Sequence, residues 1–196
     1  MKILLLSTSK FTGAGKATSK IYNSLRSIGI DCEHKVLLNN NNTLKLKLKK
    51  ISNIFKSKTN TVISNLQRGK NSDFRSLSLF PTNVSSEINN SNFDIIHLTW
   101  INEFLSIEDI GRIKKPIVWS LCDMWPITGM NHYDEYNKDA FWREKEFEKF
   151  KFSKFDLNKW IINRKKKSWK NNINLVAPSQ WLYDCAKDST ITKNFP

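Results

Sequence analysis

Two polar segments of the chain carry the side chains best suited to chemistry. The first is Thr12-Gly13-Ala14-Gly15-Lys16, which follows an aliphatic run. Glycines let a ligand approach the backbone closely, and a helix that starts behind them offers free N–H groups to an anion, to which Lys16 adds positive charge. The alternative is an ordinary tight turn, because such turns have the same composition. The spacing is not that of a Walker loop, so it does not predict a P-loop nucleotidase.

The second segment runs from residue 122 to 133 and contains Cys122, Asp123 and His132. Asp123 can orient a hydroxyl group of a ligand, or it can cap the turn that follows it. His132 can supply an imidazole for proton transfer, although a single histidine in a loop is more often merely exposed. Both segments, and the residues Thr99 to Asn102, follow apolar runs that resemble strands.

The elements that must position these residues alternate between strand and helix. Residues 2–6 predict a buried strand, and residues 16–28 place Ala17, Ile21, Leu25 and Ile28 at helical spacing. Gly29 stands where a left-handed helix cap is favoured. Further strands are predicted at 32–38, 93–98, 117–121 and 173–177. The segment 44–55 has both strand-like and helix-like periods and stays ambiguous.

Helices are predicted between these strands. Ser106 and Asp109 form a capping-box pair that starts a short helix over 106–113, and Ser179 caps a last helix. The region 141–170 is helical, basic and aromatic. This alternation predicts an α/β fold: a Rossmann-like parallel sheet with helices on both faces. Ligands of such sheets bind beyond the carboxyl ends of the strands, so the polar segments should converge there.

Composition and charge limit the class of protein. The 196 residues fit one domain, and no run of about 18 apolar residues predicts a membrane-spanning helix. Three cysteines, far apart and odd in number, argue against a disulfide framework and fit a reducing cytosol. No CxxC or HExxH spacing occurs, so no structural metal is predicted.

The net charge of +14 is concentrated in residues 44–70 and 141–170. The second segment mixes eleven basic residues and four acidic ones with eight aromatic ones. A solvated helix face explains most such runs, but basic and aromatic residues together also suit an anionic membrane surface. Nucleic acid would be attracted by the same field, but no nucleic-acid-binding motif accompanies it, so nucleic acid is not predicted as a partner.

A series of short motifs in the second half of the chain matches a known family. They are His97-Leu98-Thr99-Trp100-Ile101-Asn102, Phe104-Leu105-Ser106-Ile107-Glu108-Asp109, Lys115-Pro116-Ile117-Val118-Trp119, Asp123-Met124-Trp125, Thr128-Gly129, His132-Tyr133, Trp169-Lys170 and Pro178-Ser179-Gln180-Trp181-Leu182. In combination they resemble the N-terminal domain of family 4 glycosyltransferases of the bacterial exopolysaccharide and lipopolysaccharide type, including the colanic-acid-like enzymes. The resemblance covers most of the chain and is strongest from about Ser76 onward.

The resemblance implies a GT-B fold, of which residues 1–196 would be the N-terminal, acceptor-side domain without the C-terminal donor-binding domain. The implied activity is retaining transfer of a sugar from a nucleotide-diphosphate sugar, bound as a co-substrate, to a surface-polysaccharide or lipid-linked glycan acceptor. Relatives grip the nucleotide with two Glu separated by seven residues, and no such pair occurs in this chain. We therefore expect the isolated chain to be inactive, with no tightly bound cofactor.

Site residues follow from the same resemblance. Asp123, Cys122 and His132 would be catalytic, and Gly13, Gly15 and Lys16 would lie near the donor phosphates. The substrate-binding residues would be Thr99, Trp100, Asn102, Trp125 and Tyr133. Trp100 and Trp125 are either platforms for stacking on a sugar or buried core residues. Relatives usually have His where this chain has Cys122, and a thiol cannot replace an imidazole as a charged donor.

The implied location is cytoplasmic, peripheral on the inner face of the cell membrane, where lipid-linked acceptors lie. That location would give the basic and aromatic segment 141–170 a purpose. The alternative is a non-catalytic remnant, or a membrane- or glycan-binding module, of the same fold.

Overall fold

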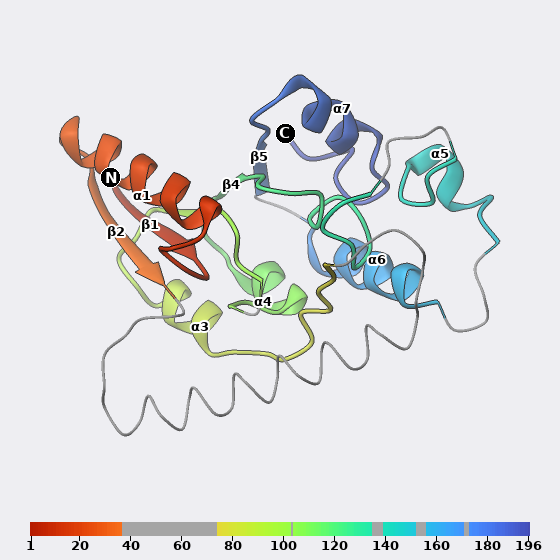
Figure 1. Ribbon diagram of the computed structural model, residues 1–196. Helices are drawn as coiled ribbons and strands as arrows, with labels where there is room; N and C mark the ends of the chain where they lie inside the picture. Colours follow the sequence, from red (N-terminus) through yellow and green to blue (C-terminus); the bar gives the residue numbers. More distant parts are fainter. Residues whose placement is uncertain (37–73, 103, 135–138, 152–155, 171–172) are drawn as a thin grey trace.

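A computed structural model of the protein describes residues 1–36, 74–102, 104–134, 139–151, 156–170 and 173–196 (Figure 1). Its centre is one sheet of five parallel strands in the order β2-β1-β3-β4-β5. The strands are β1 (Lys2–Ser7), β2 (Asp31–Val36), β3 (Ile95–Leu98), β4 (Ile117–Ser120) and β5 (Ile173–Val176). The helices are α1 (Gly13–Ser27), α3 (Val84–Asn89), α4 (Ile107–Arg112), α5 (Glu144–Phe147), α6 (Leu157–Ser168) and α7 (Gln180–Asp188).

The burial patterns of the strands agree with their inner or edge positions in the sheet. In β1 every residue from Ile3 to Ser7 is buried, as expected for an inner strand covered on both faces. In β2 and β5 exposed residues alternate with buried or partly buried ones, and these two strands lie at the edges of the sheet. The parallel sheet with helices confirms the predicted α/β, Rossmann-like fold.

Two apolar clusters pack on the sheet. The large one contains Leu4 and Leu6 of β1 together with buried residues of α3, α4, α6 and α7. The small one contains Ile3, Leu5 and Cys32, against which Ile21, Tyr22 and Leu25 of α1 pack. Because successive β1 side chains point to opposite faces, the two clusters lie on opposite sides of the sheet, with α1 alongside β1 and β2 (Figure 1).

Local signals in the sequence account for several element ends. Gly29 has a φ of 80°, the left-handed value predicted for the cap after α1. Ser106 and Asp109 form the predicted capping box at the start of α4, and the Ser179 side chain accepts from the backbone N–H of Leu182 at the start of α7.

Other predictions need adjustment. The basic and aromatic region contains two separate helices, α5 and α6, and α3 was not predicted at all. The ambiguous segment 44–55 lies outside the described residues, as do the last two residues of the predicted strand 32–38. Among the described residues, no helix is long and apolar enough to cross a membrane.

The direction in which the chain adds strands to the sheet reverses after β2. The chain adds β2 on one side of β1 and then returns to place β3 on the other side. The carboxyl ends of β1 and β3 therefore lie side by side at a topological switch point, the usual binding position in open parallel sheets.

Candidate functional site

The segments that follow β1 and β3 are tied together by hydrogen bonds. Thr8 donates its backbone N–H to the Trp100 carbonyl at 2.8 Å and its hydroxyl to the Asn102 carbonyl at 2.7 Å. Thr99 is buried, and its hydroxyl bonds Thr18 of α1 at 2.7 Å and donates to the Leu6 carbonyl at 3.1 Å. Thr99 thus joins β1, β3 and α1, and its hydroxyl is already engaged by protein groups.

Asp123 follows β4 at the same edge of the sheet. Its Oδ1 accepts the backbone N–H of Trp125 at 2.9 Å, and its Oδ2 lies 2.6 Å from His132 Nδ1. One oxygen therefore caps the following turn and the other holds an imidazole. The residue is 9% exposed, so it is buried except for a small part of its surface.

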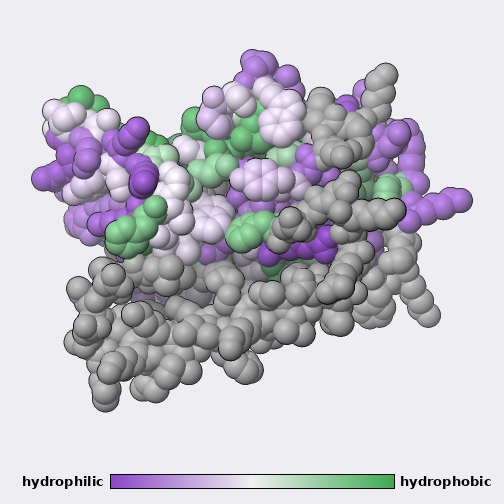
Figure 2. Space-filling view, viewed as in Figure 1, coloured by the Kyte–Doolittle hydropathy of each residue, from purple (hydrophilic) through white to green (hydrophobic). Residues whose placement is uncertain are grey.

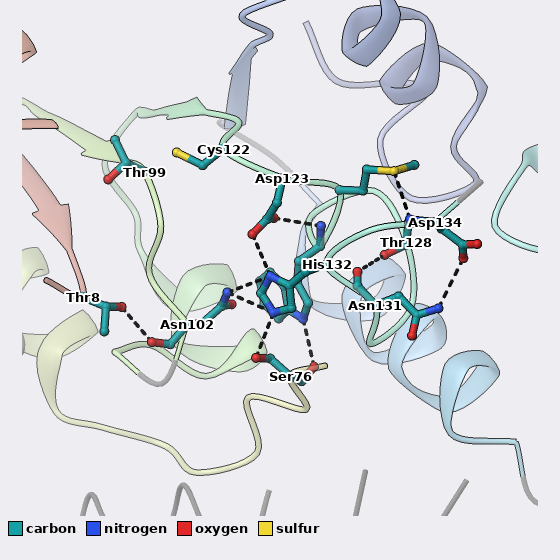
Figure 3. Close-up of polar contacts among 12 residues, drawn as sticks. Thr8, Ser76, Thr99, Asn102, Cys122, Asp123, Thr128, Asn131, His132 and Asp134 are labelled. Atoms are coloured by element: carbon teal, nitrogen blue, oxygen red, sulfur yellow. Dashed lines mark hydrogen bonds and ion pairs between the residues drawn. The ribbon is translucent and has the colours of Figure 1, made fainter. Parts of the chain in front are cut away.

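His132 is completely buried, unlike the exposed loop histidine that is the commoner case. Its Nδ1 faces Asp123, and its Nε2 lies 2.9 Å from the hydroxyl oxygen of Ser76 (Figure 3). The backbone of His132 is also fixed, because its N–H donates to the Phe74 carbonyl and its carbonyl accepts from Met124. The structure thus brings together the two predicted residues Asp123 and His132 with Ser76.

Aromatic rings surround this imidazole. The Phe74 ring is 4.4 Å from it, edge to face, and Trp100 packs on Phe74 at 5.8 Å. Trp125 lies in the core against Trp119 and Trp169, with its Nε1 donating to the Ser76 carbonyl at 2.9 Å. Of the two alternatives for Trp125, the structure therefore places it as a core residue with no free face for a sugar.

Trp100 is half-buried, and Tyr133, beside His132, is 65% exposed. Asn102 is buried, and its amide nitrogen lies 3.3 Å and 3.2 Å from the two ring nitrogens of His132. Of the five predicted substrate-binding residues, Trp100 and Tyr133 are thus the two with substantial exposed surface.

Cys122 is exposed, next to Asp123. Desolvation by the surrounding protein atoms, followed by the Asp123 charge, raises the pKa of the Cys122 thiol to about 11. The side chain is therefore a neutral thiol at pH 7, and it is neither a general base nor a thiolate nucleophile under those conditions.

The glycine-containing loop leads into α1. Thr12 is the N-cap, and its hydroxyl accepts the Gly15 N–H at 3.2 Å. A β-carbon at Gly15 would lie 1.8 Å from the Ser9 carbonyl oxygen, whereas one at Gly13 would meet nothing within 4 Å. Gly15 is therefore required by close packing of the loop on the helix, and Gly13 and the Lys16 side chain remain open to solvent.

Lys165 of α6 supports the loop that carries His132. The side chain is fully buried, and its ammonium donates to the carbonyls of Trp125, Thr128 and Gly129 and lies over the Trp125 ring. Burial lowers the pKa of Lys165 well below its ordinary value, against the opposing effect of the nearby Asp123 charge. Three carbonyl contacts give this buried group a full set of acceptors.

Sequence reasoning assigned no role to Ser76 or Lys165. A signal for Lys165 exists, because it lies at helical spacing from Ile161, Ile162 and Trp169, all of which are buried. Ser76 has no such local signal, since its partner His132 is 56 positions away. Within the described parts of the chain, no group of three or more His, Cys, Asp or Glu residues could hold a metal ion.

Comparisons of the chain with protein-family models, with curated proteins and with solved structures found no match.

Proposed function

We propose that the chain is an acceptor-side glycosyltransferase domain that takes part in retaining transfer of a sugar from a nucleotide-diphosphate sugar to a surface-polysaccharide or lipid-linked glycan. The observation that carries this proposal is the convergence of polar segments at the carboxyl ends of β1, β3 and β4, beside the point where strand order reverses. That position suits a nucleotide-linked ligand in an open parallel sheet. The motif series around Asp123 and His132 adds the glycosyltransferase assignment.

In this proposal Asp123 orients the acceptor. Its carboxylate is held by Trp125 and His132, so it would present a fixed hydrogen-bond acceptor to a sugar hydroxyl. The N-terminus of α1, with Lys16 exposed on its first turns, would offer positive potential to the departing diphosphate. A retaining transfer depends on such positioning and charge stabilisation, and the neutral Cys122 thiol takes no proton in it.

Two observations favour the alternative of a non-catalytic glycan-binding module. His132 has no exposed surface, and the thiol that stands where relatives usually place an imidazole is neutral. A domain in this state could bind an acceptor without assisting transfer. The dependence on a donor-binding domain stays a prediction for the transferase function alone.

The test combines binding with turnover. Radiolabelled nucleotide sugars are incubated with the protein and a bacterial membrane extract, and transfer to organic-extractable or polymeric product is measured. In parallel, amide chemical shifts are followed while polysaccharide fragments are added. We expect shifts at Asn102, Cys122 and Asp123, and any transfer should fall at least about tenfold in Asp123→Asn, a loss of roughly 1.4 kcal/mol of transition-state stabilisation.

Asp184→Asn is the matched control, because Asp184 is an exposed carboxylate of α7 whose side chain bonds Gln180. It should leave both readouts unchanged. Glycan binding without transfer, even when a donor-binding domain is supplied, would favour the binding module. Absence of both binding and transfer would overturn the two proposals together.

A further inference from the structure

Ser76, His132 and Asp123 form a continuous hydrogen-bonded series at the core of the site. His132 Nδ1 lies 2.6 Å from Asp123 Oδ2, and its Nε2 lies 2.9 Å from Ser76 Oγ (Figure 3). An ionised carboxylate only accepts hydrogen bonds, so it fixes the hydrogen on Nδ1 and leaves the lone pair of Nε2 facing the Ser76 hydroxyl. This is the arrangement in which a carboxylate orients a base and the base activates a nucleophile.

The backbone of Ser76 is fixed on both sides. Its N–H donates to the Met130 carbonyl at 2.9 Å, and its carbonyl accepts Trp125 Nε1 at 2.9 Å. These contacts fix the backbone position from which the hydroxyl reaches the imidazole. Such pre-positioning is what a nucleophile needs, since a misplacement of about 1 Å can lower the rate about a hundredfold.

Asn102 places an amide against the same imidazole. Its nitrogen is nearly equidistant from the two ring nitrogens, at 3.3 Å and 3.2 Å, so it cannot lie along the lone pair of either. Its hydrogens therefore do not replace the Ser76 hydroxyl at Nε2. A neutral amide donor against the base, whose Nε2 lies 2.9 Å from the Ser76 hydroxyl, is the kind of group that can stabilise an oxyanion.

Apolar groups cover this assembly and limit what can reach it. Ser76 is 6% exposed, while Phe74, whose ring lies on His132, is 46% exposed. The base thus lies beneath a surface aromatic ring, and the apolar rings around it favour small apolar groups over large polar ones. Exclusion of water also strengthens the interactions among the three polar residues.

We propose that Ser76 is the nucleophile of a second activity, cleavage of short-chain acyl esters, with His132 as its general base and Asp123 as the residue that orients His132. The Ser76 oxygen attacks the ester carbonyl carbon while its proton moves to His132 Nε2. The carbonyl oxygen gains the electron pair and accepts a hydrogen bond from Asn102. When the tetrahedral intermediate collapses, the alcohol leaves with the proton from His132 and Ser76 carries the acyl group.

Water completes the reaction in the same way. His132 takes a proton from the water, the hydroxide attacks the acyl carbon, and collapse releases a carboxylic acid while Ser76 recovers its hydrogen. The sum is hydrolysis of an ester to an acid and an alcohol, and it needs no other reactant. This activity is independent of sugar transfer, although Asp123 would serve in both.

The test uses an alkyl fluorophosphonate, which reacts covalently with activated serines, on the folded wild-type protein. Intact-mass measurement and peptide mapping should find one adduct, on Ser76, and p-nitrophenyl acetate should be hydrolysed. Asp123→Asn should slow both reactions at least about a hundredfold, because the base loses its orienting carboxylate. Ser86→Ala, an exposed serine of α3, is the control and should react as the wild type does.

The mapped adduct on wild-type protein decides the question even where Ser76→Ala or His132→Gln fails to fold. No adduct, or an adduct on another residue, overturns the proposal. So does an adduct on Ser76 that forms at the same rate in Asp123→Asn, since the network is then a clamp between the segment 74–78 and the loop 122–132. The probe needs no sugar nucleotide, so its outcome is separate from that of the transfer assay.

Discussion

The side chain of Lys165 fixes the loop that carries Asp123 and His132. Its neighbours Lys166 and Lys167 are exposed, but its own ammonium sits beneath the loop that carries Asp123 and His132 and binds three of its carbonyls. Those carbonyls lie in the interior, where an acceptor without a partner is costly. Lys165 therefore acts as an internal hydrogen-bond donor around which residues 125–129 are arranged.

Replacing this lysine should destabilise the protein strongly. Lys165→Met keeps the apolar stem but leaves three buried carbonyls without their donor, at an expected cost of about 3 kcal/mol in the free energy of unfolding. Lys167→Met, two positions along the same helix, should change it by less than about 0.5 kcal/mol. Urea unfolding of both variants measures the difference, and equal stabilities would mean that the loop does not depend on the buried ammonium.

Cys122 should react slowly with alkylating reagents. Its pKa of about 11 leaves few thiolates at pH 8, so the rate of iodoacetamide alkylation should rise about tenfold per pH unit and level off only near pH 11. Mass mapping separates Cys122 from the buried Cys32 and Cys185. A rate that is already half-maximal near pH 8.5 would indicate a thiol with an ordinary pKa of about 8.5. A bound nucleotide sugar should slow the labelling further if the residue faces the cleft.

The sequence could place Asp123 and His132 in one loop, but it could not show that they touch. Their contact spans nine positions, and the contact of His132 with Ser76 spans 56, so neither follows from helix or strand periodicity. The sequence leaves the burial of Trp125 open for the same reason. Such contacts depend on which strands become neighbours, and only the folded sheet decides that.

The glycine loop and α1 illustrate constraints at the scale of one element. Gly15 sits where the loop after β1 crosses the first turn of the helix, and Gly13 begins that turn in open space. The sequence alone predicts the same ligand-binding role for both glycines. The structure separates them by packing alone, because a side chain is excluded at one position and admitted at the other.

Alanine at these two positions should have opposite effects. Gly15→Ala forces the loop and the helix apart and should lower the free energy of unfolding by at least about 2 kcal/mol. Gly13→Ala removes a flexible glycine from the unfolded chain and should raise stability by about 0.4–1 kcal/mol. Thermal unfolding of the pair provides the measurement. A mild effect at Gly15 would show that the Ser9 carbonyl can move aside.

Elements with strong local signals were predictable, and those with weak signals were not. Two such signals are the capping box of Ser106 and Asp109 and the continuous aliphatic run of β1. Both are properties of short segments, so they can be recognised without knowledge of tertiary contacts. The six residues of α3 contain only two apolar side chains, Val84 and Ile88, too few to define a period. This helix exists because both side chains pack into the large apolar cluster.

The molecule as a whole carries a net charge of +14, which should govern its binding to surfaces. On the face in Figure 2, hydrophilic residues cover much of α1, and apolar ones appear only in small groups. On α6, Lys159, Lys166 and Lys167 are exposed, and so is the ring of Trp160. An anionic membrane is thus a partner that both the charge and the aromatic side chain would suit.

Vesicle sedimentation tests this membrane prediction. The protein should bind phosphatidylserine-containing vesicles at low salt, be released as salt rises, and leave neutral vesicles unbound, since each basic residue near the surface contributes about 1 kcal/mol. Lys167→Glu on α6 should weaken binding several-fold more than Lys20→Glu on α1, although both change the net charge equally. Equal weakening would show that net charge alone drives binding and that α6 does not face the membrane.

The unequal apolar clusters on the two sides of the sheet have a consequence for how the molecule opens. Among the described residues, the small cluster on the α1 side has only Ile3, Leu5 and Cys32 as buried apolar side chains, whereas the large cluster includes buried side chains from the other helices. Detaching α1 and β2 therefore exposes little apolar surface and costs only part of the global free energy of unfolding. Amide hydrogens of α1 and β2 should exchange with deuterium well before those of β3 and β4, and the helix that borders the candidate site would be the first piece of the fold to leave it.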